Sequence, residues 1–201
     1  MGGMRALIIV DVQNDFCEGG SLAVDGGGEV ARAISRYLQD GHGYAHVVAT
    51  NDYHVDPGSH FSDEPDYASS WPRHCVVGTP GVRFHPDLDI TRVEAVFRKG
   101  THAAAYSGFE GVDDAGTPLG DWLREHDVHE VDVVGIATDY CVRATAADAA
   151  RAGFATRVLL GLTAGVTPES TAKAIEEMSA AGVELVGTPL LEEQIPGLGG
   201  D

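Results

Sequence analysis

Short apolar runs without polar alternation are the feature that most constrains the fold of this chain. Residues 5–10, RALIIV, form such a run, and Asp11 ends it. A strand that is apolar on both sides is typical of a parallel sheet whose two faces are covered by helices. Similar runs recur along the chain with helical patterns between them, which predicts an α/β fold.

Six strands and four helices are expected from these patterns. The strands are predicted at 5–10, 44–50, 93–98, 130–137, 155–160 and 183–186, and the helices at 28–40, 117–126, 140–152 and 167–181. We expect a three-layer fold in which the parallel strands have the order 3-2-1-4-5-6 and helices lie on both faces. In that order the first and fourth strands are neighbours, so Asp11 and Cys141 would face each other.

Composition limits the classes of protein to consider. The chain has 201 residues, 43% of them hydrophobic, which suits one domain over residues 1–201, with 187–201 as a possible loose tail. A net charge of -18 would repel nucleic acids and anionic membranes, so neither is an expected partner. Three cysteines without short spacing imply no disulfide framework and favour the reducing cytoplasm. A monomer and a homo-oligomer are both compatible with the sequence.

The segment 51–92 interrupts the alternation and is rich in Pro, His, Asp and Ser. Long irregular segments inside compact domains are usually functional. Asp52, His54 and His60 lie within nine positions, and His74 follows. The Asp-x-His spacing brings two ligands to one side of an extended segment. We therefore expect this insertion to bind one divalent metal ion, with Fe²⁺, Mn²⁺ and Zn²⁺ all open.

Three further residues follow predicted strands and could perform catalysis together. Cys141 lies at an expected helix start, where the helix dipole favours a nucleophilic thiolate. Asp11 could accept the thiol proton, and Lys99, one of two lysines, could hold both anions. The backbone of GIATD, just before the thiol, suits an oxyanion hole. Each residue also has a structural interpretation: a buried apolar thiol, a turn residue and a solvated charge.

Aromatic residues accompany these groups. Phe16 follows the first strand, Trp71 precedes His74, and Tyr106 lies in the loop after Lys99. Each could serve packing alone. Because all three are expected near the carboxyl ends of the strands, they favour a flat, aromatic substrate.

Several motifs occur together and in a characteristic order. They are IIVDVQNDF, NDYHVDPGSH, SSWPRHC, FRKG, AYSGFEGV and GIATDYCV, and they extend from about Met4 to Val186. With them the chain resembles the nicotinamidase/pyrazinamidase family of the isochorismatase-like cysteine hydrolase superfamily. The resemblance implies a six-stranded isochorismatase-like hydrolase fold. It also implies hydrolysis of nicotinamide to nicotinic acid and ammonia in NAD salvage, and of pyrazinamide to pyrazinoic acid.

The resemblance also implies roles for individual residues. The catalytic triad would be Asp11, Lys99 and Cys141, with a thioester on the cysteine, and the metal ligands would be Asp52, His54, His60 and His74. Substrate binding would involve Phe16, Trp71, Tyr106, Ile136 and Ala137, with Phe16 and Trp71 on the two sides of the pyridine ring. The Ile136–Ala137 peptide would be cis, and the N–H groups of Ala137 and Cys141 would form the oxyanion hole.

The sequence is also compatible with other functions. An amidohydrolase of the same superfamily could act on a carbamoyl or ureido group, although the full metal set and Trp71 suit a pyridine ring better. Isochorismatase itself lacks the nucleophilic cysteine. A non-catalytic metal-binding or ligand-binding protein would leave nicotinamide unconsumed. Tyr140 stands where some pyrazinamide-cleaving members have histidine, which could shift substrate preference.

Overall fold

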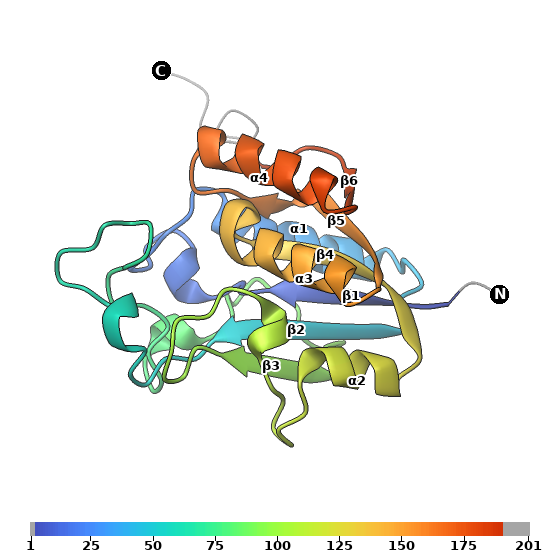
Figure 1. Ribbon diagram of the computed structural model, residues 1–201, viewed down its shortest axis with the longest axis horizontal. Helices are drawn as coiled ribbons and strands as arrows, with labels where there is room; N and C mark the ends of the chain where they lie inside the picture. Colours follow the sequence, from blue (N-terminus) through green and yellow to red (C-terminus); the bar gives the residue numbers. More distant parts are fainter. Residues whose placement is uncertain (1–2, 191–201) are drawn as a thin grey trace.

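The computed structural model describes residues 3–190, which form one parallel sheet with helices on both sides (Figure 1). The strands have the order β3-β2-β1-β4-β5-β6, as expected. They are β1 (Met4–Val10), β2 (His46–Asp52), β3 (Ala95–Lys99), β4 (Val128–Ile136), β5 (Ala155–Ala164) and β6 (Glu184–Val186). The helices are α1 (Gly27–Gln39), α2 (Leu119–Glu125), α3 (Arg143–Arg151) and α4 (Pro168–Ala180).

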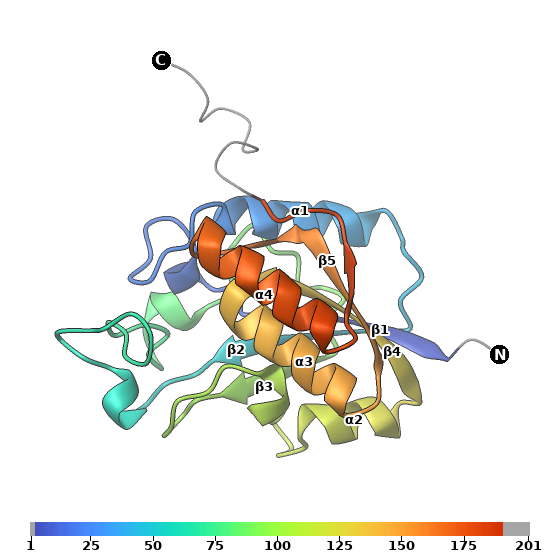
Figure 2. The same ribbon diagram turned by 45° about the horizontal axis from the view of Figure 1, so that its top comes forward.

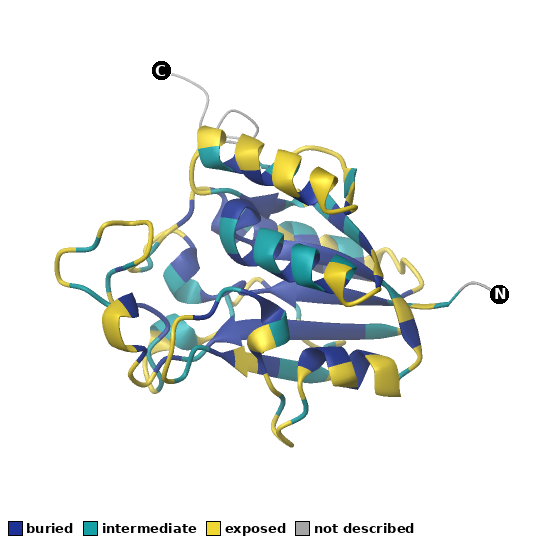
Figure 3. Ribbon diagram, in the orientation of Figure 1, coloured by how far each residue is buried: buried dark blue, intermediate teal, exposed yellow. Residues whose placement is uncertain are grey.

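The continuous apolar runs are explained by two cores, one on each face of the sheet. Ile8 belongs to the core that β1 shares with α2, α3 and α4, whereas Leu7 and Ile9 belong to the core that β1 shares with α1. Successive side chains of a strand point to opposite faces, so a strand covered on both faces must be apolar throughout. Figure 3 shows the buried strands between the exposed outer faces of the helices.

The segment after β4 differs from the simple strand and helix that the sequence predicts. Gly135 has a φ of 118°, and a Cβ atom there would lie 2.1 Å from the carbonyl oxygen of Val10 on β1. Only glycine allows this approach of two backbones. The chain then forms a π-helical turn, Thr138–Val142, before α3 begins at Arg143. Cys141 therefore lies inside the π-helical turn, and not at the start of the α-helix.

Irregular segments gather at one end of the sheet, where they continue β1, β2 and β3 (Figure 2). The 51–92 segment contains only two short 3-10 turns, Gly58–His60 and Pro80–Val82, after the end of β2. At the other end of the chain, the Leu190 N–H donates to the carbonyl of Thr163, so the start of the expected tail is bound to β5. Its remainder, 191–201, lies outside the described residues. Among residues 3–190, no helix is long and apolar enough to span a membrane.

Candidate active site

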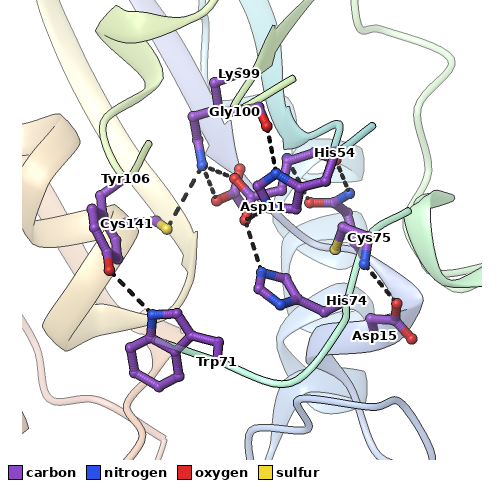
Figure 4. A network of polar contacts seen from close by, with 12 residues as sticks. Asp11, Asp15, His54, Trp71, His74, Cys75, Lys99, Gly100, Tyr106 and Cys141 are labelled. Carbon is purple, nitrogen blue, oxygen red and sulfur yellow. Dashed lines mark hydrogen bonds and ion pairs between the residues drawn. The ribbon is translucent and has the colours of Figure 1, made fainter. Parts of the chain in front are cut away.

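The predicted catalytic residues lie together at the carboxyl ends of neighbouring strands (Figure 4). Asp11 follows β1 directly, while Asp52 and Lys99 are the last residues of β2 and β3 and are paired in register. Cys141 comes from the π-helical turn after β4, the strand that pairs with β1. The strand order thus brings together four residues from distant parts of the chain.

One buried ammonium group connects these side chains. Lys99 Nζ donates to Asp11 Oδ2 at 2.7 Å and to Asp52 Oδ1, and it lies 3.7 Å from Cys141 Sγ. Lys99 is 1% exposed, and the two carboxylates and the thiol are also buried. Unpaired charges are costly inside a protein, so this shared pairing is what allows the four ionisable groups to be buried together.

Burial and pairing act differently on the pKa values of these groups. Burial raises the pKa of Cys141 well above its usual value, and the nearby Lys99 opposes this rise only in part. Burial likewise raises the pKa of Asp11 against the effect of Lys99. Burial lowers the pKa of Lys99, but Asp11 and Asp52 outweigh it and hold that pKa well above its usual value. Burial thus favours the protonated thiol and opposes the thiolate that a helix dipole would favour. The thiol lies beside Asp11, a potential base.

A second group of side chains, the histidine–aspartate cluster, lies next to Lys99. It consists of Asp52, His54, His60 and His74, the four predicted metal ligands. The potential ligand atoms of the three histidines lie within 4.8 Å of one another. Asp52 Oδ2 is 3.4 Å from His54 Nε2 and 3.6 Å from His74 Nε2. Asp52 thus directs one oxygen to Lys99 and the other to the histidines.

The hydrogen bonds of this cluster leave ring nitrogens free to bind a cation. His54 Nδ1 lies 2.5 Å from the carbonyl of Gly100, and His74 Nδ1 lies 2.8 Å from that of Pro72. A carbonyl only accepts, so each Nδ1 carries the hydrogen and each Nε2 presents a lone pair. His54 Nε2 and His60 Nδ1 are buried and have no hydrogen-bond partner among the described residues.

The chemistry of this donor set fits a divalent transition metal. Burial lowers the pKa of His60 to about 4, with smaller contributions from His74 and His54, so its imidazole is neutral near pH 7. Neutral imidazoles and one carboxylate suit Zn²⁺, Mn²⁺ and Fe²⁺. Gly100, which supports His54, has a φ of 75°, and a Cβ atom there would lie 2.6 Å from the imidazole ring. The cluster therefore depends on glycine at this position.

A cavity of about 410 Å³ opens between the thiol and the histidine–aspartate cluster. Trp71 and Tyr106 border it and are joined by a hydrogen bond of 3.1 Å from Trp71 Nε1 to the tyrosine hydroxyl. Tyr140 meets Trp71 edge to face, with ring centroids 5.2 Å apart. The cavity is also lined by further residues of the predicted site, namely Phe16, Asp52, His60, His74, Ile136, Ala137 and Cys141. The cavity lining is mainly aromatic and apolar, with a smaller polar part.

The structure brings together all the residues that the sequence singled out for the site, and the Ile136–Ala137 peptide is cis, as the resemblance implied. Other residues were not anticipated. Gln13 exchanges two hydrogen bonds of 2.9 Å with the backbone of Asp52, and Thr50 donates to Asp11. Val166, Thr167 and Ser170, at the start of α4, form part of the cavity wall. Polar residues at strand ends are the only sequence signal that pointed to Gln13 and Thr50.

The sequence and the fold are similar to those of known proteins. The isochorismatase domain model matches residues 5–189. The nicotinamidase/pyrazinamidase of Mycobacterium tuberculosis is 68% identical, in an alignment that covers 91% of this chain and 98% of the relative. The nicotinamidase of Escherichia coli is 38% identical over 90% of this chain and 93% of its own length.

Solved structures of a pyrazinamidase and of PnC1 are also similar to this protein. A pyrazinamidase of Pyrococcus horikoshii in complex with zinc has a TM-score of 0.77 and 39% identity, and the match covers 90% of this chain and 98% of that one. PnC1 from L. infantum in complex with nicotinate has a TM-score of 0.80 and 36% identity, with 91% and 92% covered. These matches agree with the buried cysteine, lysine and aspartate and with the histidine–aspartate cluster. The chain therefore belongs to the isochorismatase domain family.

Proposed function

We propose that this protein is a metal-containing cysteine amidohydrolase that converts nicotinamide to nicotinic acid and ammonia in NAD salvage. Pyrazinamide, which has a similar ring and the same carboxamide, is a second substrate and yields pyrazinoic acid. The observation that carries the proposal is one cavity with the Cys141 thiol on one side and the histidine–aspartate cluster on the other. This arrangement suits a substrate with a carboxamide at one end and a ring nitrogen at the other.

The cavity supports a defined orientation of the substrate. Phe16 and Trp71 would hold the ring between them, and Tyr106 would limit its position through its bond to Trp71. Asp52, His54, His60 and His74 would hold one divalent ion, which would supply a cationic binding point for the ring nitrogen. The carboxamide carbon is then directed to Cys141, and the cluster serves binding and orientation.

Catalysis starts from the neutral thiol and the buried carboxylate. Asp11 accepts the proton of Cys141 as the sulfur attacks the carboxamide carbon, and Lys99 stabilises the negative charge on both groups. The N–H groups of Ala137 and Cys141 bind the oxyanion of the tetrahedral intermediate. Asp11 returns the proton to the leaving nitrogen, and ammonia departs. A water molecule, deprotonated by the same carboxylate, then hydrolyses the thioester and regenerates the thiol.

The same proposal extends to the organisation of the chain. Residues 1–201 form a single hydrolase domain, and the 51–92 segment is its metal-binding insertion. The reaction needs a free thiol at Cys141, which suits the reducing cytoplasm. Nucleic acids and membranes are not partners in this proposal, since the substrate is a small neutral amide and the net charge is -18.

Ammonia release from nicotinamide tests this function. We expect the wild type to release ammonia, Cys141→Ala to lose at least about 10³-fold in kcat, and Cys17→Ala to remain close to the wild type. Cys17 is a matched control because its thiol is also buried but does not border the cavity. Equal release from the wild type and Cys141→Ala would contradict the covalent mechanism. No release from the wild type would contradict the assignment itself.

A further inference from the structure

The proposed base, Asp11, has an unusual backbone conformation. Its φ is 50°, in the left-handed region that residues other than glycine rarely adopt. Its N–H donates to the carbonyl of Thr50 at 3.1 Å, and its own carbonyl accepts from the N–H of Gln13 at 2.8 Å. The neighbouring strand β2 therefore holds the backbone of the base in place.

The side chain of Asp11 is held by two donors from two strands. Thr50 Oγ1 on β2 donates to Oδ1 at 2.8 Å, and Lys99 Nζ on β3 donates to Oδ2 at 2.7 Å. A donor on each oxygen fixes the rotation of the carboxylate plane. Lys99 cannot do this alone, because its ammonium group is also directed to Asp52 and Cys141.

Thr50 is itself rigid. It is fully buried, and its β-branched side chain has a restricted χ1 angle. Its methyl group packs against Gly108, where a Cβ atom would lie only 2.6 Å from Thr50 Cγ2. Thr50 also lies outside the set of described residues that border the cavity. Its hydroxyl therefore has no direct contact with the cavity and is linked to the reaction through Asp11, to which it donates.

We infer that Thr50 is a positioning residue of the proposed amidohydrolase reaction, whose hydroxyl fixes the Asp11 carboxylate in the plane that directs one oxygen lone pair to Cys141. The inference rests on the proposed function. The thiol proton passes from Cys141 Sγ to an Asp11 oxygen as the sulfur–carbon bond forms, and it later passes to the departing ammonia. Both transfers need the same carboxylate orientation.

Two pairs of variants isolate the hydroxyl group. The wild type and Thr50→Val differ in the hydroxyl with little change of shape, and Thr50→Ser and Thr50→Ala differ in the hydroxyl after the methyl is gone. In each pair we expect the member without the hydroxyl to have a kcat lower by about tenfold or more, with KM within about twofold. The second pair decides the question if Thr50→Val does not fold, since alanine introduces no clash.

The pH profile supplies a readout that a purely structural role would not change. The titratable groups that face Asp11 are Lys99, Asp52, Cys141 and Cys75. A hydrogen bond from Thr50 stabilises the charged carboxylate, so its loss raises the pKa of Asp11. The acid limb of kcat/KM should therefore move to higher pH in Thr50→Val and Thr50→Ala, and stay near its wild-type position in Thr50→Ser.

Thr156→Val is the control for loss of a buried strand hydroxyl away from the site. Thr156 Oγ1 donates to the Phe154 carbonyl, and its replacement should leave kcat and the pH profile unchanged. Equal kcat values within each Thr50 pair, or an acid limb that does not move, would overturn this inference alone. A wild type that releases no ammonia would overturn the inference together with the proposed function.

Discussion

Asp11 and Asp132 are both buried carboxylates next to a cation, yet their surroundings differ. Asp132 on β4 accepts from Arg157 Nε at 2.8 Å and Nη2 at 2.6 Å, one on each oxygen, and also from the Tyr44 hydroxyl at 2.5 Å. We call Tyr44, Asp132 and Arg157 the Asp132 cluster. Asp11 instead shares the single ammonium of Lys99 with Asp52 and Cys141.

The comparison shows that burial and an ion pair do not by themselves mark a catalytic acid or base. The guanidinium of Arg157 matches both carboxylate oxygens in a rigid, bidentate geometry. Asp132 also lies outside the described lining of the cavity. The Lys99 ammonium is a point charge shared by several acceptors, and a proton donor, Cys141, lies beside it. We therefore expect the Asp132 cluster to stabilise the fold and the Asp11 site to perform chemistry.

Replacing each cation by methionine gives the largest expected difference between the two sites. Lys99→Met should reduce kcat/KM for nicotinamide by about 10³-fold, because neither the transferred charge nor the thiol retains a cation. Rates are measured on protein that circular dichroism shows to be folded. More than a tenth of wild-type activity in Lys99→Met would contradict its catalytic role.

Arg157→Met is the matched control for this change. It should keep kcat/KM within about twofold and reduce the free energy of unfolding by about 2 to 3 kcal/mol, since Asp132 loses its partner in the interior. The loss should fall at the low end for a buried pair because the Arg157 side chain is 29% exposed. Urea denaturation measures it. A large loss of activity in folded Arg157→Met would remove the distinction between the two sites.

Removal of the metal should affect the site next to Asp11 more than the Asp132 cluster. Chelation should reduce ammonia release by about tenfold or more, and Zn²⁺, Mn²⁺ or Fe²⁺ should restore it. The melting temperature should fall as well, because an ion at 100 times its Kd stabilises the folded state by about 2.7 kcal/mol. Arg157→Met should respond to chelation as the wild type does. Full activity in a metal-free sample would contradict the proposed role in binding the ring.

Alkaline pH provides the smallest predicted effect, and it concerns the Asp132 cluster. Burial raises the pKa of Tyr44, and its bonds with Asp132 and Tyr37 raise it further. A raised pKa means that Tyr44 stabilises the fold fully below its unfolded pKa of about 10 and loses this contribution as the pH rises above it. From about pH 9 to about pH 11, the free energy of unfolding of the wild type should fall by about 1 kcal/mol more than that of Tyr44→Phe. Parallel pH curves for the two proteins would contradict this prediction.

The sequence predicted the fold well because its strands carry a strong local signal. A strand buried on both faces is expected to be apolar along its length, and Ala6 to Val10 meets this condition. The run from Val131 to Ile136 meets it except at Asp132, which is paired with Arg157. The boundaries were less accurate. β5 extends to Ala164, four residues beyond its predicted end, because its second half pairs with β4 after a register shift. Local patterns carry little information about such a shift.

Asp11, Asp52, Lys99 and Cys141 came together because each stood at or after a strand end, and the parallel order places those ends at one edge of the sheet. Thr50 and Gln13 stood at the same edge, but nothing in the sequence told which acceptors they would meet. The protonation state of Cys141 could not be predicted from the sequence either. A position just before a helix suggested a thiolate, whereas full burial in the folded protein favours the thiol.

By itself, the sequence determined the α/β class, the residue types available for chemistry and, through its motifs, the family, while the expected strand order came from the usual winding of such sheets. These follow from periodicity and from local order along the chain. Only the tertiary structure decided how one lysine is shared among two carboxylates and a thiol, which ring nitrogens remain free, and which second donor holds Asp11. Hydrogen-bond geometry and desolvation depend on residues that are distant in sequence, so they are defined only once the sheet has brought those residues together.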